Sequence, residues 1–379
     1  MQSIVTAMSS ISMLKTFNRL LTLKPISWTT SRSISYLLTK LNNRQLIDVN
    51  GNDSYDYIQG LITNDMRHLR SSLETSVTQD CIYAFMLNRT GRVIADVFVY
   101  KNDHKKDEKN SLFIETDSQL LESTEKYLRS YRIRRKVDIN INSHYNVWSL
   151  FPSVNQFDDQ IITELNECEI NFKSENCEDF LVVRDPRLKQ LGFRLLVKYY
   201  ENESEDKVRD RVKKFLQSKS LDINETNAKN YDKYRYRLGV GEGVQDFPIE
   251  LCFPLECNGD FLHAISFQKG CYVGQELTAR IYHTGVIRKR LMPIEIIDGK
   301  EVIENISIQN ITANIGNESK NVGKFRSHCS TNGLALLRVD DCLKTDNLFL
   351  TKSELTIKCF KPFWWPKEMN KQSISNAKN

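Results

Sequence analysis

One cysteine in the 379-residue chain stands in a setting that suits chemistry better than packing. Residues 269–280 read KGCYVGQELTAR, so that Cys271 lies between two glycines, which let a backbone turn sharply or approach a partner closely. Residues 275–281 are mostly good helix formers, which predicts that Gly274 joins a loop to a helix. Cys271 would then precede a helix N-terminus, and both the helix dipole and the cation of Lys269 would favour a thiolate.

A thiolate presented in this way can act as a metal ligand or as a nucleophile. The alternative is a packing role, because free cysteine is among the most buried residue types. The two glycines and the lysine favour the presented sulfur over the packed one.

The same stretch resembles a family signature. The string K-G-C-Y-x-G-Q-E is similar to that of the YgfZ-type proteins, relatives of the glycine-cleavage aminomethyltransferase (GcvT). The eukaryotic branch of that family comprises mitochondrial iron-sulfur assembly factors for biotin synthase and aconitase-type enzymes. The resemblance extends to further segments of the chain, namely LNNR at 41–44, GLITND at 60–65, RYRLGVGEGV at 235–244, PLECN at 254–258, ISF at 265–267 and HTGVIRKRL at 283–291.

This resemblance implies a fold and a site. The fold would be α+β, an aminomethyltransferase-like body of antiparallel sheets and helices followed by a small C-terminal β-barrel. Cys271 would be the metal-binding residue, as a cluster ligand or reactive thiol. The supporting residues of the motif would be Lys269, Gly270, Tyr272, Gly274, Gln275, Glu276 and Arg280.

The resemblance also implies partners, namely A-type iron-sulfur scaffold proteins and client 4Fe-4S enzymes. One cysteine cannot hold an iron-sulfur cluster alone. Further ligands must therefore come from a partner or from a cofactor such as glutathione, and the cluster would be shared.

The other candidate metal ligands are less well supported. The nine cysteines are odd in number and show no C-x-x-C spacing, so neither a disulfide framework nor a zinc ribbon is indicated. Cys252 and Cys257 lie close enough to Cys271 in sequence to suggest a cluster-binding triplet, but the signature includes only Cys271. His263 and His283 flank the stretch as candidate ligands or bases, although a lone histidine is more often a satisfied surface or core group.

Three carboxylates are candidate folate ligands. Asp96 lies in the middle of a predicted strand, Glu242 lies in a glycine-rich turn, and Glu256 lies in the approach to the cysteine. The aminomethyltransferase relatives bind tetrahydrofolate with adjacent aspartates on the equivalent strand, whereas Ala95 stands here where one of them would be. The resemblance therefore implies one central cavity lined by the three carboxylates, and the loss of the pair counts against ordinary aminomethyl transfer. The alternative is that each carboxylate makes unrelated local hydrogen bonds.

The charge distribution predicts a targeting segment. The first 47 residues hold six of the 53 Lys and Arg residues and no Asp or Glu, so the remaining 47 basic residues face 48 acidic ones. A neutral body argues against a nucleic-acid partner. Apolar residues at helical spacing between 11 and 21, in a Ser- and Thr-rich context, are typical of a mitochondrial presequence, and the mature chain is expected to begin between residues 30 and 42 in the matrix. A disordered polar tail is the alternative. The chain has no apolar run of the length that a membrane span needs.

Periodicity and turn signals predict the elements that position these residues. We expect helices over 53–66, 118–130 and 201–220, and a hairpin of strands 81–87 and 92–100. The basic stretch 131–137 is a candidate nucleic-acid strip, a candidate site for a folate tail, or the solvated end of a helix. The predicted parts are a presequence (1–36), an N-terminal α+β lobe (37–145), a second α+β lobe with the cysteine stretch (146–285), a β-barrel with a docked aromatic tail (286–366), and a disordered tail (367–379).

Three functions remain open at this point. The first is a late-acting mitochondrial iron-sulfur assembly factor, without enzymatic activity of its own, that helps to mature 4Fe-4S proteins of the aconitase and lipoate or biotin synthase type. The second is a folate-dependent one-carbon transferase, which Asp96 and Glu242 would serve. The third is a folate-binding module of tRNA modification, which lacks support because the chain has no GTPase motif and no basic body.

Overall fold

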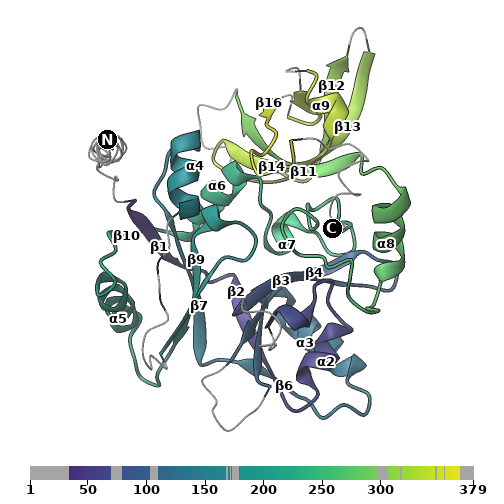
Figure 1. Ribbon diagram of the computed structural model, residues 1–379. Coiled ribbons are helices and arrows are strands. Elements are labelled where there is room, and N and C mark those ends of the chain that lie inside the picture. The colour runs from purple at the N-terminus through teal and green to yellow at the C-terminus, as the bar shows by residue number, and fades with distance from the viewer. Residues whose placement is uncertain are drawn as a thin grey trace, which may run out of the picture. The chain divides into compact units, whose positions relative to one another are not determined.

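The computed structural model describes residues 34–69, 79–102, 110–167, 170, 172, 179–297, 306–315, 318–345, 348–353 and 355–367 (Figure 1). The elements below all belong to the compact unit that starts at Ser35. The predicted presequence and disordered tail lie outside the described residues, apart from the residues at their inner boundaries. Within the described part of the chain, no helix is both long and apolar enough to cross a membrane.

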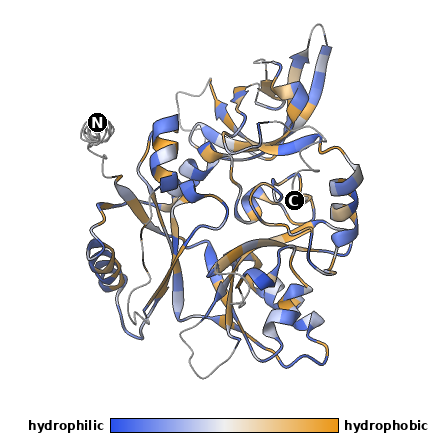
Figure 2. Ribbon diagram, viewed as in Figure 1, coloured by the Kyte–Doolittle hydropathy of each residue, from blue (hydrophilic) through white to orange (hydrophobic). Residues whose placement is uncertain are grey.

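The first sheet has five antiparallel strands in the order β3-β4-β5-β2-β6 (Figure 1). Every residue of β3 is buried, because alternate side chains point into two different hydrophobic cores. Figure 2 shows the resulting run of hydrophobic residues along these strands. The predicted hairpin is confirmed as β3 paired with β4. The bounds are β2 Arg44–Asn50, β3 Cys81–Leu87, β4 Val93–Lys101, β5 Leu112–Asp117 and β6 Asp138–Asn142.

Helices α2 (Ser54–Gln59) and α3 (Leu121–Tyr131) cover one face of this sheet. The predicted helix over 53–66 is too long, because α2 stops at its C-cap Gly60 and the chain continues into a turn. The predicted helix over 118–130 is confirmed as a short 3-10 turn followed by α3. The 3-10 turns of the chain are η1 Met66–Leu69, η2 Ser118–Leu120 and η3 Lys189–Leu191.

The second sheet has the order β10-β1-β7-β9-β8, and only β10 runs parallel to its neighbour. Helix α5 (Glu205–Gln217) lies on it, with Ser204 capping its first turn and Phe215 stacked on Phe180 at 4.5 Å between ring centroids. The predicted amphipathic helix is thus confirmed with shorter ends, whereas α4 (Asp159–Glu167) was not predicted. The bounds are β1 Tyr36–Lys40, β7 Tyr145–Pro152, β8 Phe180–Arg184, β9 Phe193–Lys198 and β10 Ile223–Glu225.

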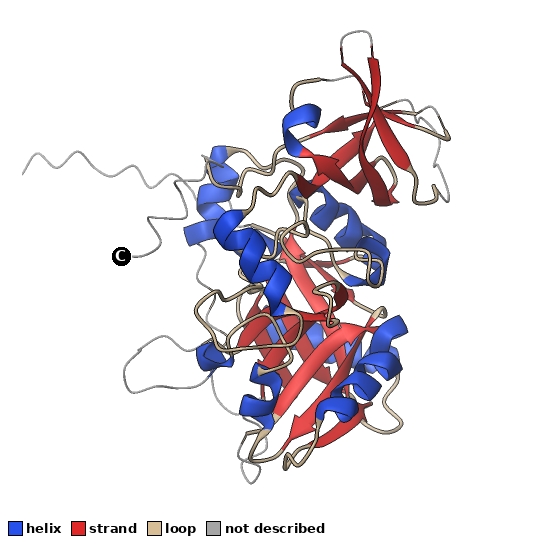
Figure 3. Cartoon of the chain, turned by 90° about the vertical axis from the view of Figure 1, so that its right-hand side faces the viewer, coloured by secondary structure: helices blue, strands red, loops and turns tan. Residues whose placement is uncertain are grey.

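The last part of the chain forms a closed barrel in the order β11-β14-β13-β12-β15-β16, which Figure 3 shows at one end of the unit. The predicted barrel is confirmed, and residues 306–308 form a loop that precedes β12. The aromatic tail docks as expected, because Trp365 is buried and Trp364 donates its ring N–H to Leu238. The bounds are β11 Lys289–Ile296, β12 Asn310–Ile315, β13 Glu318–Cys329, β14 Asn332–Arg338, β15 Leu348–Leu350, β16 Thr356–Cys359 and the one-turn helix α9 Val339–Cys342.

Three further helices connect these parts. Helix α6 (Ala228–Leu238) packs against β1 and against the barrel strands β11, β13 and β14, and its buried tyrosines join the core between the two sheets. The short α7 (Gly243–Asp246) follows it, and α8 (Gln275–Thr284) precedes the barrel. The chain from α7 to α8 is irregular and carries the cysteine stretch.

Candidate functional site

Gly274 joins the cysteine loop to a helix, as predicted. It is the N-cap of α8 with a φ of 79°, in the left-handed region that favours glycine. A Cβ there would collide with the carbonyl oxygen of Asn88 and would lie 2.9 Å from the Cβ of Leu87. The glycine therefore lets the start of α8 pack directly on the β3–β4 turn.

Cys271 is exposed, three residues before the N-cap of α8. The preceding Gly270 has open space where a side chain would be, with no atom within 4 Å of a Cβ built at that position. Its backbone is not in the left-handed region either. The packing role considered for Cys271 is therefore wrong, and the surface beside the sulfur is clear.

Lys269 anchors the loop that carries Cys271. Its ammonium donates to the carbonyl oxygens of Gln59, Ile62 and Asn64 at 2.6, 2.6 and 2.7 Å, and it lies 4.8 Å from the ring centroid of Tyr272. Burial lowers the pKa of Lys269 to about 7, and the three carbonyls favour the charged form, which can donate to all of them. The ammonium thus points into the first lobe and anchors the loop, and the expectation that this cation favours the Cys271 thiolate stays a prediction.

Other motif residues hold the loop in shape or face solvent. The side-chain oxygen of Gln275 accepts from the backbone N–H of Tyr272 at 3.2 Å, and the N–H of Val273 donates to Gly60 at 3.1 Å. Tyr272 packs against the core, whereas Glu276 and Arg280 are exposed on α8. The loop is therefore fixed on both sides of an exposed sulfur.

Two of the three predicted carboxylates do come together. Asp96 and Glu242 are 1% and 2% exposed. The guanidinium nitrogens of Arg44 lie 3.2 Å from a carboxylate oxygen of Asp96 and 4.0 Å from one of Glu242. The carboxylate of Asp96 also accepts the backbone N–H of Gly243 at 3.0 Å. Burial raises the pKa of Asp96, whereas Arg194 and Arg187 hold the pKa of Glu242 well below its usual range despite burial.

These two carboxylates belong to a buried ionic cluster that sequence reasoning missed. Arg187 and Arg194 bind Glu242 at 2.8 and 3.1 Å, and Arg194 also binds Glu115. The guanidinium of Arg194 lies 3.9 Å from the ring centroid of Phe98. The arginine within the apolar run of β9, Arg194, was the available signal, because a charge inside a buried strand requires a buried partner. The cluster comprises Arg44, Asp96, Glu115, Asp185, Arg187, Arg194 and Glu242.

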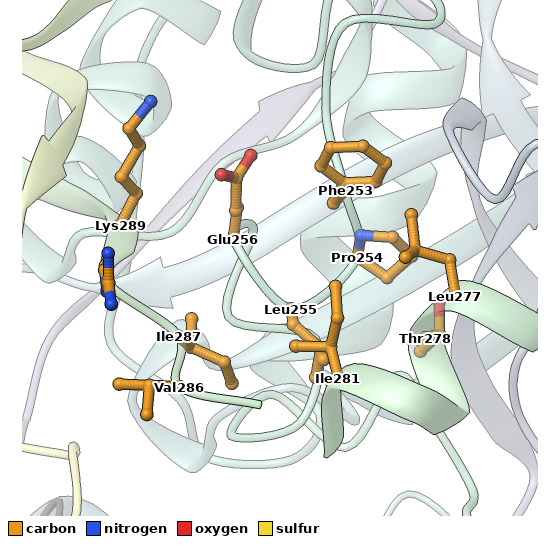
Figure 4. Close-up of a pocket in the computed structure, with 11 residues that line it drawn as sticks. Phe253, Pro254, Leu255, Glu256, Leu277, Thr278, Ile281, Val286, Ile287 and Lys289 are labelled. Carbon is orange, nitrogen blue, oxygen red and sulfur yellow. The ribbon is translucent and has the colours of Figure 1, made fainter. Parts of the chain in front are cut away.

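Glu256 does not join them, so the expectation of one cavity lined by all three carboxylates is wrong. It lines a separate pocket of about 240 Å³ beside α8, together with apolar residues such as Phe253, Leu277 and Ile281 (Figure 4). Burial raises the pKa of Glu256, and Lys289 partly opposes that shift. Its carboxylate therefore stands in an environment unrelated to the ionic cluster.

The buried cluster is a poor fit for a folate. A pteridine could reach Asp96 only by displacing Arg44 or the N–H of Gly243, and Glu242 is already bound by two arginines. Breaking a buried pair by removing one partner typically costs about 3–5 kcal/mol. Asp96 and Glu242 are therefore not assigned a role in folate chemistry.

The remaining candidates differ in their exposure to solvent. Cys252 and Cys257 are each 3% exposed, whereas His263 and His283 are exposed. Cys168 and Cys177 lie outside the described residues. Among the residues that the structure describes, no group of three or more His, Cys, Asp or Glu is placed to hold a metal ion.

Three comparisons relate this geometry to known proteins. Residues 288–367 match the family described as the CAF17 C-terminal beta-barrel domain. The chain is 33% identical over 340 residues to mouse "Iron-sulfur cluster assembly factor IBA57, mitochondrial", which covers 88% of this chain and 86% of that protein. The human protein of the same name is 31% identical, with 86% and 85% covered. In structure, the chain resembles the glycine cleavage system aminomethyltransferase T from Bartonella henselae, with a TM-score of 0.60. The match covers 88% of this chain and 87% of the other at 12% sequence identity, so this likeness shows the fold alone.

Proposed function

The chain belongs to the IBA57 family of mitochondrial iron-sulfur cluster assembly factors, and from this premise we propose a specific role for its exposed cysteine. Cys271 supplies one thiolate ligand to a cluster that is shared with an A-type scaffold protein in the matrix. The cluster is the cargo, and the clients are 4Fe-4S proteins of the aconitase and lipoate or biotin synthase type.

The observation that carries this proposal is the exposure of Cys271 on an anchored loop. Lys269 and Gly274 hold the backbone on the two sides of the sulfur, while Gly270 leaves the space beside it free. A thiolate that binds the cluster of another protein needs this combination. A mobile sulfur would bind more weakly because the loop would have to be ordered on binding, and a hindered sulfur would bind more weakly because the partner would overlap with its neighbours. The dipole of α8 adds a positive potential near the loop.

Anaerobic reconstitution tests the proposal. We expect that the purified chain, mixed with an A-type scaffold, iron and sulfide, develops a cluster absorbance band and forms a complex that contains both proteins. Cys271→Ser is expected to abolish the shared band. Cys329→Ser is a suitable control, because Cys329 is half-buried and donates to the carbonyl of Lys229. A Cys271→Ser chain that still forms the shared cluster at wild-type yield would refute the role of this thiolate.

The site does not favour a folate-dependent one-carbon transferase. Likeness to an aminomethyltransferase at 12% identity concerns the fold alone, and Asp96 and Glu242 are engaged with arginines. The same purified protein distinguishes the two functions. Turnover of a tetrahydrofolate substrate by Cys271→Ser, without any cluster, would favour the transferase.

A further inference from the structure

The pocket beside α8 has no role in the function proposed above. Leu277 and Ile281 of α8 form one wall, Phe253 and Pro254 form a second, and Val286 and Ile287 form a third (Figure 4). Val286 lies at the rim of this apolar pocket and is 58% exposed.

The size of the pocket indicates what it can hold. Its volume of about 240 Å³ is below the roughly 300–1,000 Å³ of typical cofactor and small-molecule sites. It is large enough for one apolar side chain. Buried aromatic or aliphatic anchors that fill such pockets contribute most of the affinity of many protein interfaces.

The charges around the pocket indicate which groups of the partner can lie next to that apolar side chain. Arg288 and Lys289 line the pocket, where Glu256 is the only acidic lining residue, and Lys289 and Glu256 lie on the same side of it (Figure 4). The guanidinium of Arg92 adds a third positive charge, 4.5 Å from the ring centroid of Phe253. The excess of positive charge suits an occupant that carries a carboxylate beside its apolar group.

The pocket lies within reach of a protein that is bound at Cys271. A stable interface buries about 800 Å² on each partner, and a round patch of that area has a radius of ~16 Å. Helix α8 has ten residues and is therefore ~15 Å long. A partner seated at the cysteine loop can thus reach the part of α8 where Leu277 and Ile281 line the pocket.

We propose that the pocket receives an apolar side chain, adjacent to a carboxylate, from the same scaffold protein that shares the cluster at Cys271. This inference rests on the proposed function, because it takes its partner from there. The pocket would position the scaffold on α8, and the thiolate would then complete the ligand set of the cluster.

Val286→Glu tests the inference with little risk to the fold, because Val286 is mostly exposed. We expect the affinity of the full chain for the A-type scaffold to fall about 10-fold or more, since the glutamate places a charge at the rim of an apolar contact and opposes the carboxylate of the partner. At saturating scaffold the cluster band should be that of the wild type. Ile297→Glu is the matched control, since Ile297 is 55% exposed on the barrel, and it should bind within twofold of the wild type. Lys289→Glu should slow association and reduce its dependence on salt.

The outcomes separate this inference from the proposed function. If the wild type forms the shared cluster with the scaffold but Val286→Glu binds as tightly as the wild type, the pocket is not the docking site and the role of Cys271 stands. If Val286→Glu changes only self-association in analytical ultracentrifugation, the occupant is a second copy and the inference is wrong. If the wild type and scaffold form no cluster complex, both proposals fall together.

Discussion

Gly270 and Gly274 stand in contrasting surroundings on either side of Cys271. Gly274 packs against Asn88 and Leu87 with a left-handed backbone, whereas Gly270 has open space and an ordinary backbone. Of these two positions, only 274 therefore requires a glycine for reasons that lie within the chain itself. A partner that approaches Cys271 closely would leave no room for a side chain at position 270, which would explain the glycine there.

The two alanine variants are expected to behave differently. Gly274→Ala should lower the free energy of unfolding by at least ~1–2 kcal/mol, because the left-handed backbone alone costs that much and the overlap with Asn88 adds to it. Gly270→Ala should change it by less than ~0.5 kcal/mol, yet weaken binding of the A-type scaffold. Thermal unfolding and a binding titration measure the two effects. Equal loss of stability in both variants would contradict the view that the surface beside Cys271 is clear.

The buried ionic cluster joins elements that are distant in sequence. Arg44 belongs to β2, Glu115 to β5 and Arg194 to β9, so the cluster links the two sheets across their shared core. Seven charged groups buried in this way are costly unless all are paired. Their arrangement favours a structural role over ligand binding.

Glu242→Gln tests that role. Removing this charge takes from Arg187 and Arg194 one of the two carboxylates that they share, the other being Asp185, and we expect a loss of about 3–5 kcal/mol in the free energy of unfolding. Glu225→Gln, which breaks the exposed pair with Lys213, should cost less than ~1 kcal/mol. The folded-state pKa of Glu242 is depressed, so its contribution is present above the unfolded value of about 4.5 and is lost as pH falls below it. Chemical denaturation at pH 7 and at pH 4 measures both effects, and a wild-type value for Glu242→Gln at pH 7 would show that the cluster is not structural.

Much of the element pattern was predictable because it depends on local periodicity. The β3–β4 hairpin, α5, the barrel and the Gly274 junction follow from alternation, amphipathic spacing and glycine. The length of α2 was overestimated, because apolar spacing continued past the point where Gly60 ends the helix. The buried cluster was not predicted, since its members pair only after the two sheets meet. For the same reason the sequence did not separate Glu256 from Asp96 and Glu242.

At the scale of the whole unit, the cysteine loop connects two parts of the chain. Lys269, Val273 and Gly274 bind it to the first lobe, and α8 leads from it into β11 of the barrel. The thiol and the wall of the pocket on α8 are therefore carried by one segment that both parts support. Such a segment can present the sulfur without rearrangement, which lowers the entropy cost of binding a partner.

The proposed function predicts a selective defect in 4Fe-4S proteins in cells that lack this chain. In cells that lack this protein, we expect aconitase activity and protein lipoylation to fall and to return with the wild type or with Cys329→Ser, but not with Cys271→Ser. Enzymes with 2Fe-2S clusters should be unaffected, because the proposed step comes after the simpler clusters are made. The exposure of Cys271 implies that its serine variant keeps its stability within ~0.5 kcal/mol, so normal protein abundance on immunoblots is the control. Rescue by Cys271→Ser would contradict the role of this thiolate as a cluster ligand. An equal loss of activity in 2Fe-2S enzymes would contradict a role restricted to 4Fe-4S clients.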